Sequence, residues 1–470
     1  MKTTQIRPVL ELALAHALNH LESLDQAAVA ATMTLSELRS RLAKPLNDSS
    51  IEPVQVIKEL VADAVGGIHG SAGGRFFGWV IGGSLPAALA ADWLASTWDQ
   101  NAASYATGPA VSVIEEIAGE WLKEILQLPA QASFAFVTGS QMGHATALAA
   151  ARNALLAKHD WNVERKGLMG APLIRILSSN QRHGSIDRAV RLLGLGSDSV
   201  DDLPIDEQGR LQKTTLEKEL MSRPNMPTIV LLQAGDLNIG AFDSFAELIP
   251  LAHEYQAWVH VDGAFGLWAA ASPKYQHLLA GVEHADSWTT DGHKWLNLPF
   301  DCGYVFIVDP EPHRNSMAYV ASYTVRTAGA RDQAQWNPEW SRRGRGVATY
   351  AALRQLGRAG VANLVERTCQ YAHTLVTHIG GLPGVQIVWE PQVNQGLLRF
   401  LSSKSHATEA DHDQRTEEVI AAILNTGEAF FTGTTWRGKR CMRVSVCNWQ
   451  TDANDVERAV SAVKQILELN

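Results

Sequence analysis

The spacing of apolar residues changes along the chain. Near the N-terminus they recur every three or four positions, as on one face of an amphipathic helix, at Ile6, Val9, Leu10, Ala13, Leu14, Ala17, Leu18 and Leu21. From about residue 75, short apolar runs such as 134–137, 229–232 and 258–261 alternate with longer helical patterns. This alternation predicts an α/β fold with a large, mainly parallel sheet flanked by helices.

The pattern changes again near residue 335. A long helical stretch to about residue 379 is followed by strand-like runs at 385–388, 397–400 and 442–446 and then by a last helix. A chain of 470 residues also exceeds the usual size of one domain. We therefore expect an N-terminal helical arm over 1–75, a large cofactor-binding domain over 76–335 and a smaller α+β domain over 336–470.

Composition narrows the class of protein. Apolar residues make up 46% of the chain and charged residues 19%, which is typical of folded globular proteins. The formal net charge of -9, without a run of basic residues, argues against nucleic acid as a partner. The amphipathic start is no signal peptide, and no stretch has the roughly 20 uninterrupted apolar residues of a membrane span. We expect a cytoplasmic protein without a membrane partner.

Cysteine and histidine spacing gives no sign of a metal. Cys302, Cys369, Cys441 and Cys447 form no CxxC pair, so we interpret them as reduced structural thiols. The histidines do not take paired ligand spacing on one face of an element. We therefore expect no metal site.

Two residues suggest covalent chemistry at the carboxyl ends of strands. Asp262 closes the apolar run 258–261, where ligands bind in such sheets, although an Asp there is often a turn former or helix cap. Lys294 lies in a loop between His293 and Trp295. Desolvation would lower the pKa of its amine and increase the neutral fraction that can form an imine. A surface lysine beside a structural histidine is the alternative.

Two further segments have features of a cofactor site. The small-residue turn 138–144 opens an Ala-rich helix, whose free N–H groups and positive dipole end favour an anion such as a phosphate. It matches neither the dinucleotide fingerprint nor the phosphate-binding loop with its Lys, which argues against a nucleotide-binding oxidoreductase. His183 follows the strand-like run 173–177, where its imidazole could stack on an aromatic cofactor or simply cap a helix.

Taken in order, these segments resemble the group II pyridoxal 5'-phosphate (PLP) dependent amino-acid decarboxylases, which have the aspartate-aminotransferase fold (fold type I). The resemblance covers about residues 60–465. It is carried by His260-Val261-Asp262-Gly263-Ala264, by Asp286-Ser287 followed by His293-Lys294-Trp295, and by Ser178-Ser179 with His183.

The resemblance implies roles for individual residues. Lys294 would hold PLP as a Schiff base, Asp262 would pair with the pyridine nitrogen, and His183 would lie over the ring; these three are the expected catalytic residues. Other expected cofactor contacts are Gly139, Ser140, Gln141 and His293 around the phosphate, Ala264 on the other ring face and Asp236 near the phenolic oxygen. Arg443 would lie near the substrate carboxylate.

Three positions depart from the family pattern. Gln333 aligns where many relatives carry a Tyr as proton donor, and Tyr323 is the nearest tyrosine upstream. Asp236 stands where many relatives have a Thr. Asp291 stands where a neutral residue is common near the phosphate. An ionised carboxylate would repel the cofactor there unless it turned away or capped a loop, and we expect its side chain to turn away.

The resemblance also implies a homodimer with shared active sites, since the segment 98–103 corresponds to a region that reaches the neighbouring subunit's pocket. We expect Phe76, Phe77, Trp98 and Asn101 to contact the substrate, unless they only build the interface. The predicted activity is decarboxylation of an L-amino acid. The alternatives are retro-aldol cleavage, an aldehyde-forming decarboxylation with deamination, or a non-catalytic PLP-binding homologue, against which the presence of both Lys294 and Asp262 argues.

Overall fold

The computed structural model describes residues 6–319 and 327–469, which group into two compact units. The large unit comprises Gly82–Ala372 and Pro391–Gly396. The small unit combines the N-terminal segment up to Ile81 with His373–Glu390 and the segment from Leu397 onward. The three consecutive domains expected from sequence, with boundaries near 75 and 335, stay a prediction.

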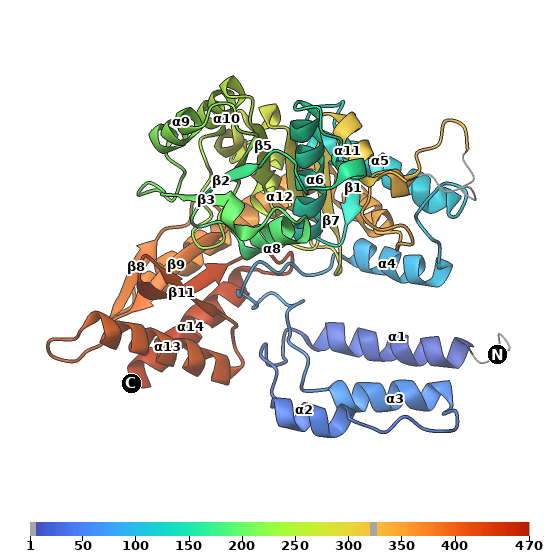
Figure 1. The fold of residues 1–470 in the computed structure, drawn as a ribbon. Coiled ribbons are helices and arrows are strands. Elements are labelled where there is room, and N and C mark those ends of the chain that lie inside the picture. Colours follow the sequence, from blue (N-terminus) through green and yellow to red (C-terminus); the bar gives the residue numbers. More distant parts are fainter. Residues whose placement is uncertain (1–5, 320–326, 470) are drawn as a thin grey trace. The chain divides into compact units, whose positions relative to one another are not determined.

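A seven-stranded sheet forms the centre of the large unit (Figure 1). Its strand order is β1-β7-β6-β5-β4-β2-β3. Neighbouring strands from β6 to β3 run parallel, whereas β7 is antiparallel to both β1 and β6. The predicted α/β class with a mainly parallel sheet is confirmed. The strands are β1 (Ser133–Val137), β2 (Arg175–Ser179), β3 (Val200–Leu203), β4 (Thr228–Gln233), β5 (Trp258–Asp262), β6 (Ser287–Asp291) and β7 (Gly303–Ile307).

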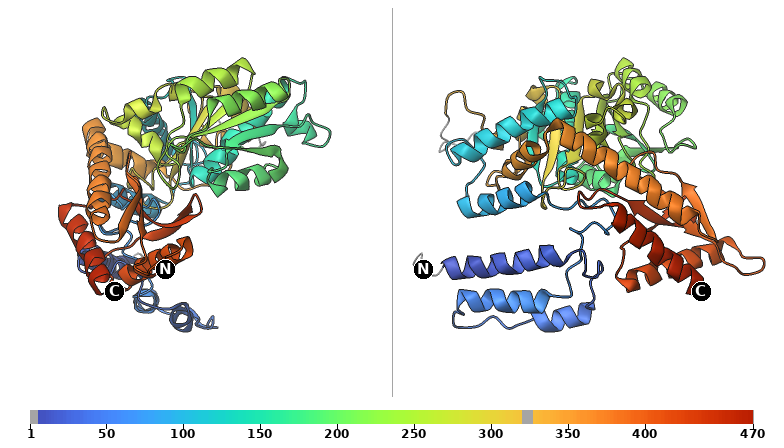
Figure 2. Two further views of the ribbon diagram at one scale, coloured as in Figure 1. Left: turned by 90° about the vertical axis from the view of Figure 1, so that its left-hand side faces the viewer. Right: turned by 180° about the vertical axis from the view of Figure 1, so that it is seen from behind.

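The helices of the large unit pack against this sheet. Helix α6 crosses β5, β6 and β7 and has α8 and α11 beside it (Figures 1 and 2). Within α12, Gly357 has non-helical backbone angles and marks a kink. The helices are α4 (Pro86–Trp98), α5 (Pro109–Ile125), α6 (Ser140–Ala157), α7 (Val163–Lys166), α8 (Gly184–Leu192), α9 (Lys213–Ser222), α10 (Phe245–Glu254), α11 (Pro310–Met317) and α12 (Gly346–Gly380), the last of which continues into the small unit.

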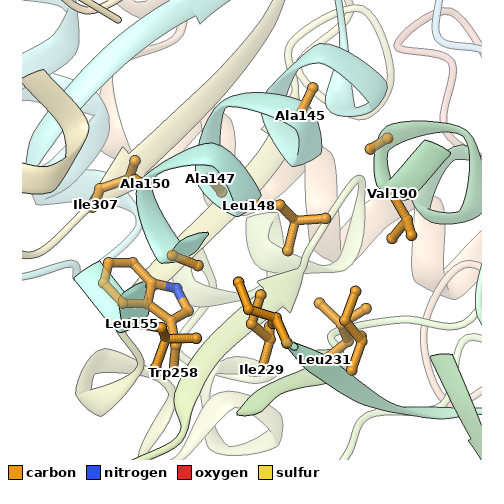
Figure 3. Close-up of a cluster of buried hydrophobic side chains, with 14 of the residues drawn as sticks. Ala145, Ala147, Leu148, Ala150, Leu155, Val190, Ile229, Leu231, Trp258 and Ile307 are labelled. Atoms are coloured by element: carbon orange, nitrogen blue, oxygen red, sulfur yellow. The ribbon is translucent and has the colours of Figure 1, made fainter. Parts of the chain in front are cut away.

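Small side chains let α6 approach the sheet closely. Figure 3 shows Ala145, Ala147 and Ala150 of this helix in one apolar cluster with side chains of the strands below it. The members include Leu148 and Leu155 of α6, Val190 of α8, Ile229 and Leu231 of β4, Trp258 of β5 and Ile307 of β7. The strands are buried on both faces, which explains why β4 and β5 appear in the sequence as nearly continuous apolar runs.

Strand register brings four chain segments to one edge of the sheet. Asp262, at the end of β5, pairs with Gln233 of β4 and Thr289 of β6. Gly303, at the start of the antiparallel β7, pairs with both Val137 of β1 and Asp291 of β6. The loops that follow β1, β4, β5 and β6 therefore begin at the same edge, which is where ligands bind in open α/β sheets.

The small unit contains a four-stranded sheet in the order β10-β11-β9-β8, in which the pairs β10/β11 and β8/β9 are antiparallel. Its strands are β8 (Val385–Trp389), β9 (Gln395–Phe400), β10 (Thr432–Trp436) and β11 (Lys439–Ser445), β9 beginning two residues before the unit boundary. Its helices are α1 (Ile6–Ser23), α2 (Leu35–Leu42), α3 (Pro53–Ala64), α13 (Glu409–Thr426) and α14 (Ala453–Leu469).

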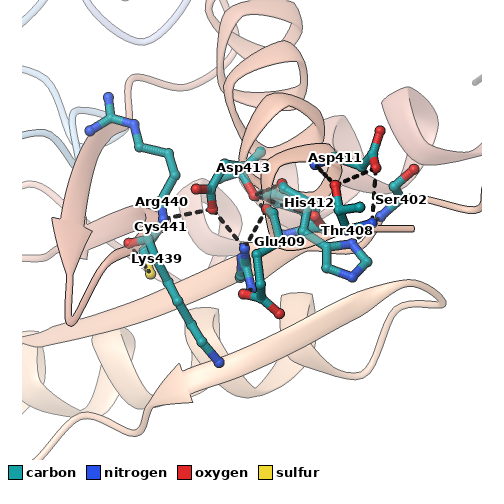
Figure 4. Close-up of polar contacts among 12 residues, drawn as sticks. Ser402, Thr408, Glu409, Asp411, His412, Asp413, Lys439, Arg440 and Cys441 are labelled. Carbon is teal, nitrogen blue, oxygen red and sulfur yellow. Dashed lines mark hydrogen bonds and ion pairs between the residues drawn. The ribbon is translucent and has the colours of Figure 1, made fainter. Parts of the chain in front are cut away.

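Charged hydrogen bonds fix α13 to this sheet (Figure 4). Arg399 of β9 donates to Glu409 Oε2 and to Asp413 Oδ1, each at 2.6 Å. Asp413 also accepts the backbone N–H of Arg440 at 2.9 Å. Thr408 and Asp411 form a capping box at the start of the helix, which satisfies first-turn N–H groups.

No helix within residues 6–319 and 327–469 is long and apolar enough to cross a membrane. In the same residues, no three His, Cys, Asp or Glu side chains come together as metal ligands would.

Candidate active site

Lys294 lies in the turn that follows β6, with about a quarter of its side chain exposed (24%). Its Nζ is 3.0 Å from Oδ2 of Asp291, the last residue of β6. The side chain of Asp291 is almost fully buried (3% exposed). The amine is thus held at the carboxyl edge of the sheet by an acid three residues before it.

The other oxygen of Asp291 faces the start of helix α6. Oδ1 accepts the backbone N–H of Ser140 at 2.6 Å. The expectation that this carboxylate turns away is therefore wrong. The physical reason is that both the positive end of a helix and an ammonium group attract a carboxylate, and Asp291 reaches both at once.

His293 is oriented by its own loop. Its Nδ1 accepts the backbone N–H of Cys302 at 3.1 Å, so in the neutral ring the proton sits on Nε2, which lies 3.8 Å from Asp291 Oδ2. The ring packs against Phe300 with centroids 4.5 Å apart. Burial lowers the pKa of His293, despite the nearby carboxylate, and this favours the neutral ring.

Asp262 is a buried and ionised acid. Its Oδ1 accepts the N–H of Ala264 at 3.1 Å, and its Oδ2 lies 3.5 Å from Nε2 of His144. Burial by itself would raise the pKa of Asp262, but the nearby His144, the ammonium of Lys294 and the backbone N–H of Ala264 lower it below its ordinary value. The carboxylate therefore stays charged across the whole physiological pH range.

A chain of hydrogen bonds stands behind Asp262. Nδ1 of His144 is 3.0 Å from Nε2 of His260, and Nδ1 of His260 is 2.9 Å from Oγ of Ser287. The indole N–H of Trp258 donates to the same Oγ at 2.9 Å. Burial, with His144 nearby, lowers the pKa of His260 to about 3, so this ring is neutral near pH 7.

His144 is the member of this chain that faces the acid, with its Nε2 toward Oδ2 of Asp262. Neither His144 nor this chain was predicted from the sequence. One signal was present, since His260 and Asp262 are two apart in a strand and therefore share a face.

Several expected cofactor residues surround this edge. Gly139 and Ser140 form the turn between β1 and α6, and the next residue, Gln141, accepts a hydrogen bond from Arg188 of α8 at 3.2 Å. His183 follows β2, is exposed, and caps α8 by accepting the N–H of Ser185 at 3.2 Å. This capping contact is the alternative considered from sequence, and it does not test stacking on a cofactor.

Asp236 serves the loop that follows β4. Oδ1 accepts the N–H of Asn238 at 2.7 Å, and Oδ2 accepts that of Ala241 at 2.9 Å. These bonds give the carboxylate a structural role in its own loop. A contact with the cofactor's phenolic oxygen stays a prediction.

The expected substrate residues fall into both units. Phe76, Phe77 and Arg443 belong to the small unit, where all three are buried; Phe76 stacks on Phe430 with centroids 4.4 Å apart. Trp98 and Asn101 belong to the large unit. Trp98 is 44% exposed at the end of α4, whereas Asn101 Oδ1 accepts the N–H groups of Ala103 and Arg342. Substrate contact stays a prediction for all five.

The expected proton-donor region is only partly described. Gln333 lies in the short 3₁₀ helix η6 (Gln333–Gln335) and is fully buried, with its amide donating to the carbonyl of Ser112 at 3.3 Å. Tyr323 lies outside the described residues.

The residues present at the sheet edge suit PLP. Lys294 offers an amine, Asp262 offers a charged carboxylate for a ring nitrogen, and Oγ of Ser140 is buried without a hydrogen-bond partner in the described part of the chain. A lysine and an ionised carboxylate at the carboxyl edge of an α/β sheet are the two groups that a PLP-dependent enzyme needs.

Comparison with known proteins gives the family. Residues 45–400 match the model of the pyridoxal-dependent decarboxylase conserved domain. The chain is 25% identical to an aromatic-L-amino-acid decarboxylase of Bacillus atrophaeus, over 96% of this chain and 93% of that protein. It is 27% identical to an L-2,4-diaminobutyrate decarboxylase of Rhizobium meliloti, over 80% and 74% of the two chains. The chain belongs to the pyridoxal-dependent decarboxylase family.

A solved structure agrees in fold. The crystal structure of Oryza sativa TDC with PLP and tryptamine superposes with a TM-score of 0.93 at 22% identity, covering 100% of this chain and 99% of that one. The predicted family, fold and cofactor are confirmed, and the chain is a PLP-dependent amino-acid decarboxylase.

Proposed function

We propose that this decarboxylase removes the α-carboxylate of an L-amino acid as carbon dioxide at the sheet edge of the large unit, with PLP attached to Lys294. The observation that carries the assignment is the position of the buried Asp262, at the end of β5, and of Lys294, in the turn after β6, at the same edge of the sheet. An ionised carboxylate suits the ring nitrogen at one end of the cofactor, and an amine suits the carbon at the other end that forms the Schiff base.

Each neighbouring group then has a defined task. PLP, when bound, supplies the electron sink for the pair left on Cα. Asp262 would hold the ring-nitrogen proton, and the histidine chain keeps Asp262 charged. Lys294 would hold the cofactor through its amine until the substrate amine takes that position. Gly139, Ser140, Gln141 and His293 would hold the phosphate, with His183 and Ala264 on the ring faces, and a proton must replace the lost carboxylate at Cα.

The source of that proton keeps a second reaction under consideration. Gln333 stands where relatives place a tyrosine, and its amide is already bonded to Ser112 in the interior. Without a proton donor at Cα, the decarboxylated substrate would instead be oxidised by dioxygen and release its nitrogen as ammonia, which gives an aldehyde. Retro-aldol cleavage would break the Cα–Cβ bond in place of the bond to the carboxylate. These two reactions are the second candidate. An amine as the sole organic product would exclude both.

Reduction and mapping test the assignment. The wild type, Lys294→Ala and the control Lys274→Ala are reduced with borohydride in the presence of PLP, and the labelled peptide is identified by mass spectrometry. We expect label on Lys294 in the wild type and the control and none there in Lys294→Ala, with loss of carbon dioxide release in Lys294→Ala only. A label on another lysine in the wild type would overturn the assignment.

The substrate side chain and the assembly complete the proposal. Exposed Trp98 favours a substrate with an aromatic side chain, as in the name of the Bacillus relative. A screen of amino acids that measures carbon dioxide, amine and aldehyde together tests this choice.

We propose a homodimer with shared sites, supported by exposed apolar residues on α1 and α3. The four free and buried cysteines support a reducing compartment such as the cytoplasm.

A further inference from the structure

An acid of the chain itself occupies the place expected for the cofactor's phosphate. Asp291 Oδ1 accepts the Ser140 N–H at 2.6 Å, and it would lie 3.5 Å from a β-carbon on Gly139. The carboxylate therefore lies against the Gly139–Ser140 turn, where the helix offers its free donors. It also neutralises Lys294 from 3.0 Å.

The strand next to Asp291 is shaped around this carboxylate. A β-carbon at Gly303, its partner across the sheet, would lie 2.7 Å from Asp291 Oδ1 and 2.5 Å from the Cα of Gly139. Only glycine leaves room there. The acid is thus enclosed by β7, the turn and Lys294, and its position does not depend on an exposed, mobile side chain.

One donor of the turn is engaged by Asp291 and another is not. The Ser140 N–H is taken, whereas the Ser140 hydroxyl is buried and has no hydrogen-bond partner within the described residues. A phosphate bound at the turn would need both donors and would meet the carboxylate at close range. Two anions at such a distance in a buried site repel each other strongly.

We propose that Asp291 is an internal competitor of the cofactor's phosphate. In the cofactor-free enzyme it holds the Ser140 N–H and the Lys294 ammonium, and it must give up both as the cofactor binds. The inference rests on the proposed function, which assigns Lys294 and the 139–141 turn to PLP. It follows that a neutral residue at position 291 binds the phosphorylated cofactor more tightly than the native acid does.

The test compares cofactors with and without a phosphate. Cofactor-free wild type, Asp291→Asn and Asp291→Ser are titrated with PLP and with pyridoxal, followed by absorbance. Both variants are expected to bind PLP about tenfold or more tightly, as for loss of one adjacent like charge. Affinity for pyridoxal, which forms the same imine without a phosphate, should change much less.

A matched control separates this effect from helix capping. Asp309 caps α11 by accepting the N–H of Glu311 at 2.9 Å, as Asp291 does for α6, so Asp309→Asn should bind PLP like the wild type. Asn at position 291 keeps an oxygen for the Ser140 N–H, so the fold should persist, and a thermal melt verifies this. Equal or weaker PLP binding by both folded variants overturns the inference, as does an equal gain for pyridoxal.

Binding of inorganic phosphate distinguishes a failure of the competitor role of Asp291 from a failure of the proposed function. Inorganic phosphate should bind cofactor-free Asp291→Asn about tenfold more tightly than the wild type, whether or not PLP attaches to Lys294. If phosphate binding responds but no PLP is found on Lys294, the proposed function fails and the competitor role stands. If PLP maps to Lys294 but phosphate and PLP bind both proteins equally, only the competitor role fails.

Discussion

Among the residues of the site, Asp262 depends most on neighbours that are distant in sequence. Its charge is maintained by His144 from α6, and the orientation of His144 is fixed in turn by His260, Ser287 and Trp258. All of these side chains are buried, where an imidazole without partners would be costly. The chain therefore fixes both the position and the protonation state of the acid.

Replacing His144 tests this dependence. In His144→Leu the pKa of Asp262 should rise, because burial then acts with less opposition. As the pH falls, Asp262 of the variant becomes protonated, whereas Asp262 of the wild type stays ionised because its pKa is lower. The ratio of the variant's Kd for PLP to that of the wild type should therefore increase by about tenfold between pH 8 and pH 5, as measured by absorbance titration.

His313→Leu is the matched control for this pH profile. His313 is equally buried, and burial lowers its pKa to about 3, but its partners are Ser133 and the carbonyl of Trp336. Its loss should leave the pH dependence of PLP binding unchanged. A His144→Leu profile parallel to that of the wild type would show that His144 only fills space.

Some site residues could be predicted from sequence and others could not. Asp262 could be predicted because it follows a recognisable apolar run, and Lys294 because it lies in a motif of the family. The orientation of Asp291 was predicted wrongly, since like-charge repulsion and loop capping were considered but the attraction of Lys294 was not. His144 was missed because its contact with Asp262 depends on how a helix packs on a strand, which spacing along the chain does not encode.

At the scale of elements, the contact between α6 and the sheet positions the Gly139–Ser140 turn. Gly143, one turn into α6, lies directly over β6, and a β-carbon there would overlap the hydroxyl of Thr289. That hydroxyl is fixed, because it donates to the carbonyl of Tyr304 at 2.8 Å. Helix and sheet can approach this closely only with glycine at position 143.

Gly143→Ala should therefore destabilise the protein. Overpacking at a rigid contact typically lowers the free energy of unfolding by about 1–3 kcal/mol, which urea titration can measure. Gly184→Ala is the control, since nothing lies within 4 Å of a β-carbon at this first residue of α8. Its unfolding free energy should rise slightly or stay within about 1 kcal/mol. Equal stability of the two variants would contradict the packing argument.

The apolar pattern predicted several of the strands that are buried on both faces. The runs in β1, β4 and β5 correspond to observed strands. β3 and β10 were not predicted, because their sequences, VDDL and TGTTW, are largely polar and partly exposed. β7 was not predicted either, although it is buried. Its antiparallel direction depends on the path of the connection and not on side-chain periodicity.

For the whole molecule, the helices of the N-terminal segment leave apolar side chains exposed. Ile6, Leu10, Leu14 and Leu18 recur every four residues along α1, and each is at least 42% exposed. Val56 and Leu60 of α3 are exposed as well. An apolar stripe of this kind is costly in water and typical of a surface that another chain covers, which supports a second copy as its partner.

Charged residues introduced on this apolar stripe should dissociate the dimer. We expect the wild type to elute as a dimer in size-exclusion chromatography with light scattering, and Leu10→Glu/Leu14→Glu to shift towards a monomer. Met169→Glu, at a position in the large unit that is 93% exposed, should remain a dimer. Circular dichroism checks that the helices persist. A folded double variant that stays dimeric would exclude α1 from the interface.

The pairing of Asp291 with Lys294 and the start of α6 also affects how the enzyme obtains its cofactor in a cell. Many enzymes draw on one small pool of free PLP, and by mass action those with the highest affinity fill first. In the cofactor-free enzyme Asp291 already pairs with the Ser140 N–H and the Lys294 ammonium, so PLP binding would release less free energy than it would at an unpaired site. When PLP is scarce, this decarboxylase would then be loaded less completely than the same chain with a neutral residue at position 291, so its activity would follow the supply of PLP more closely.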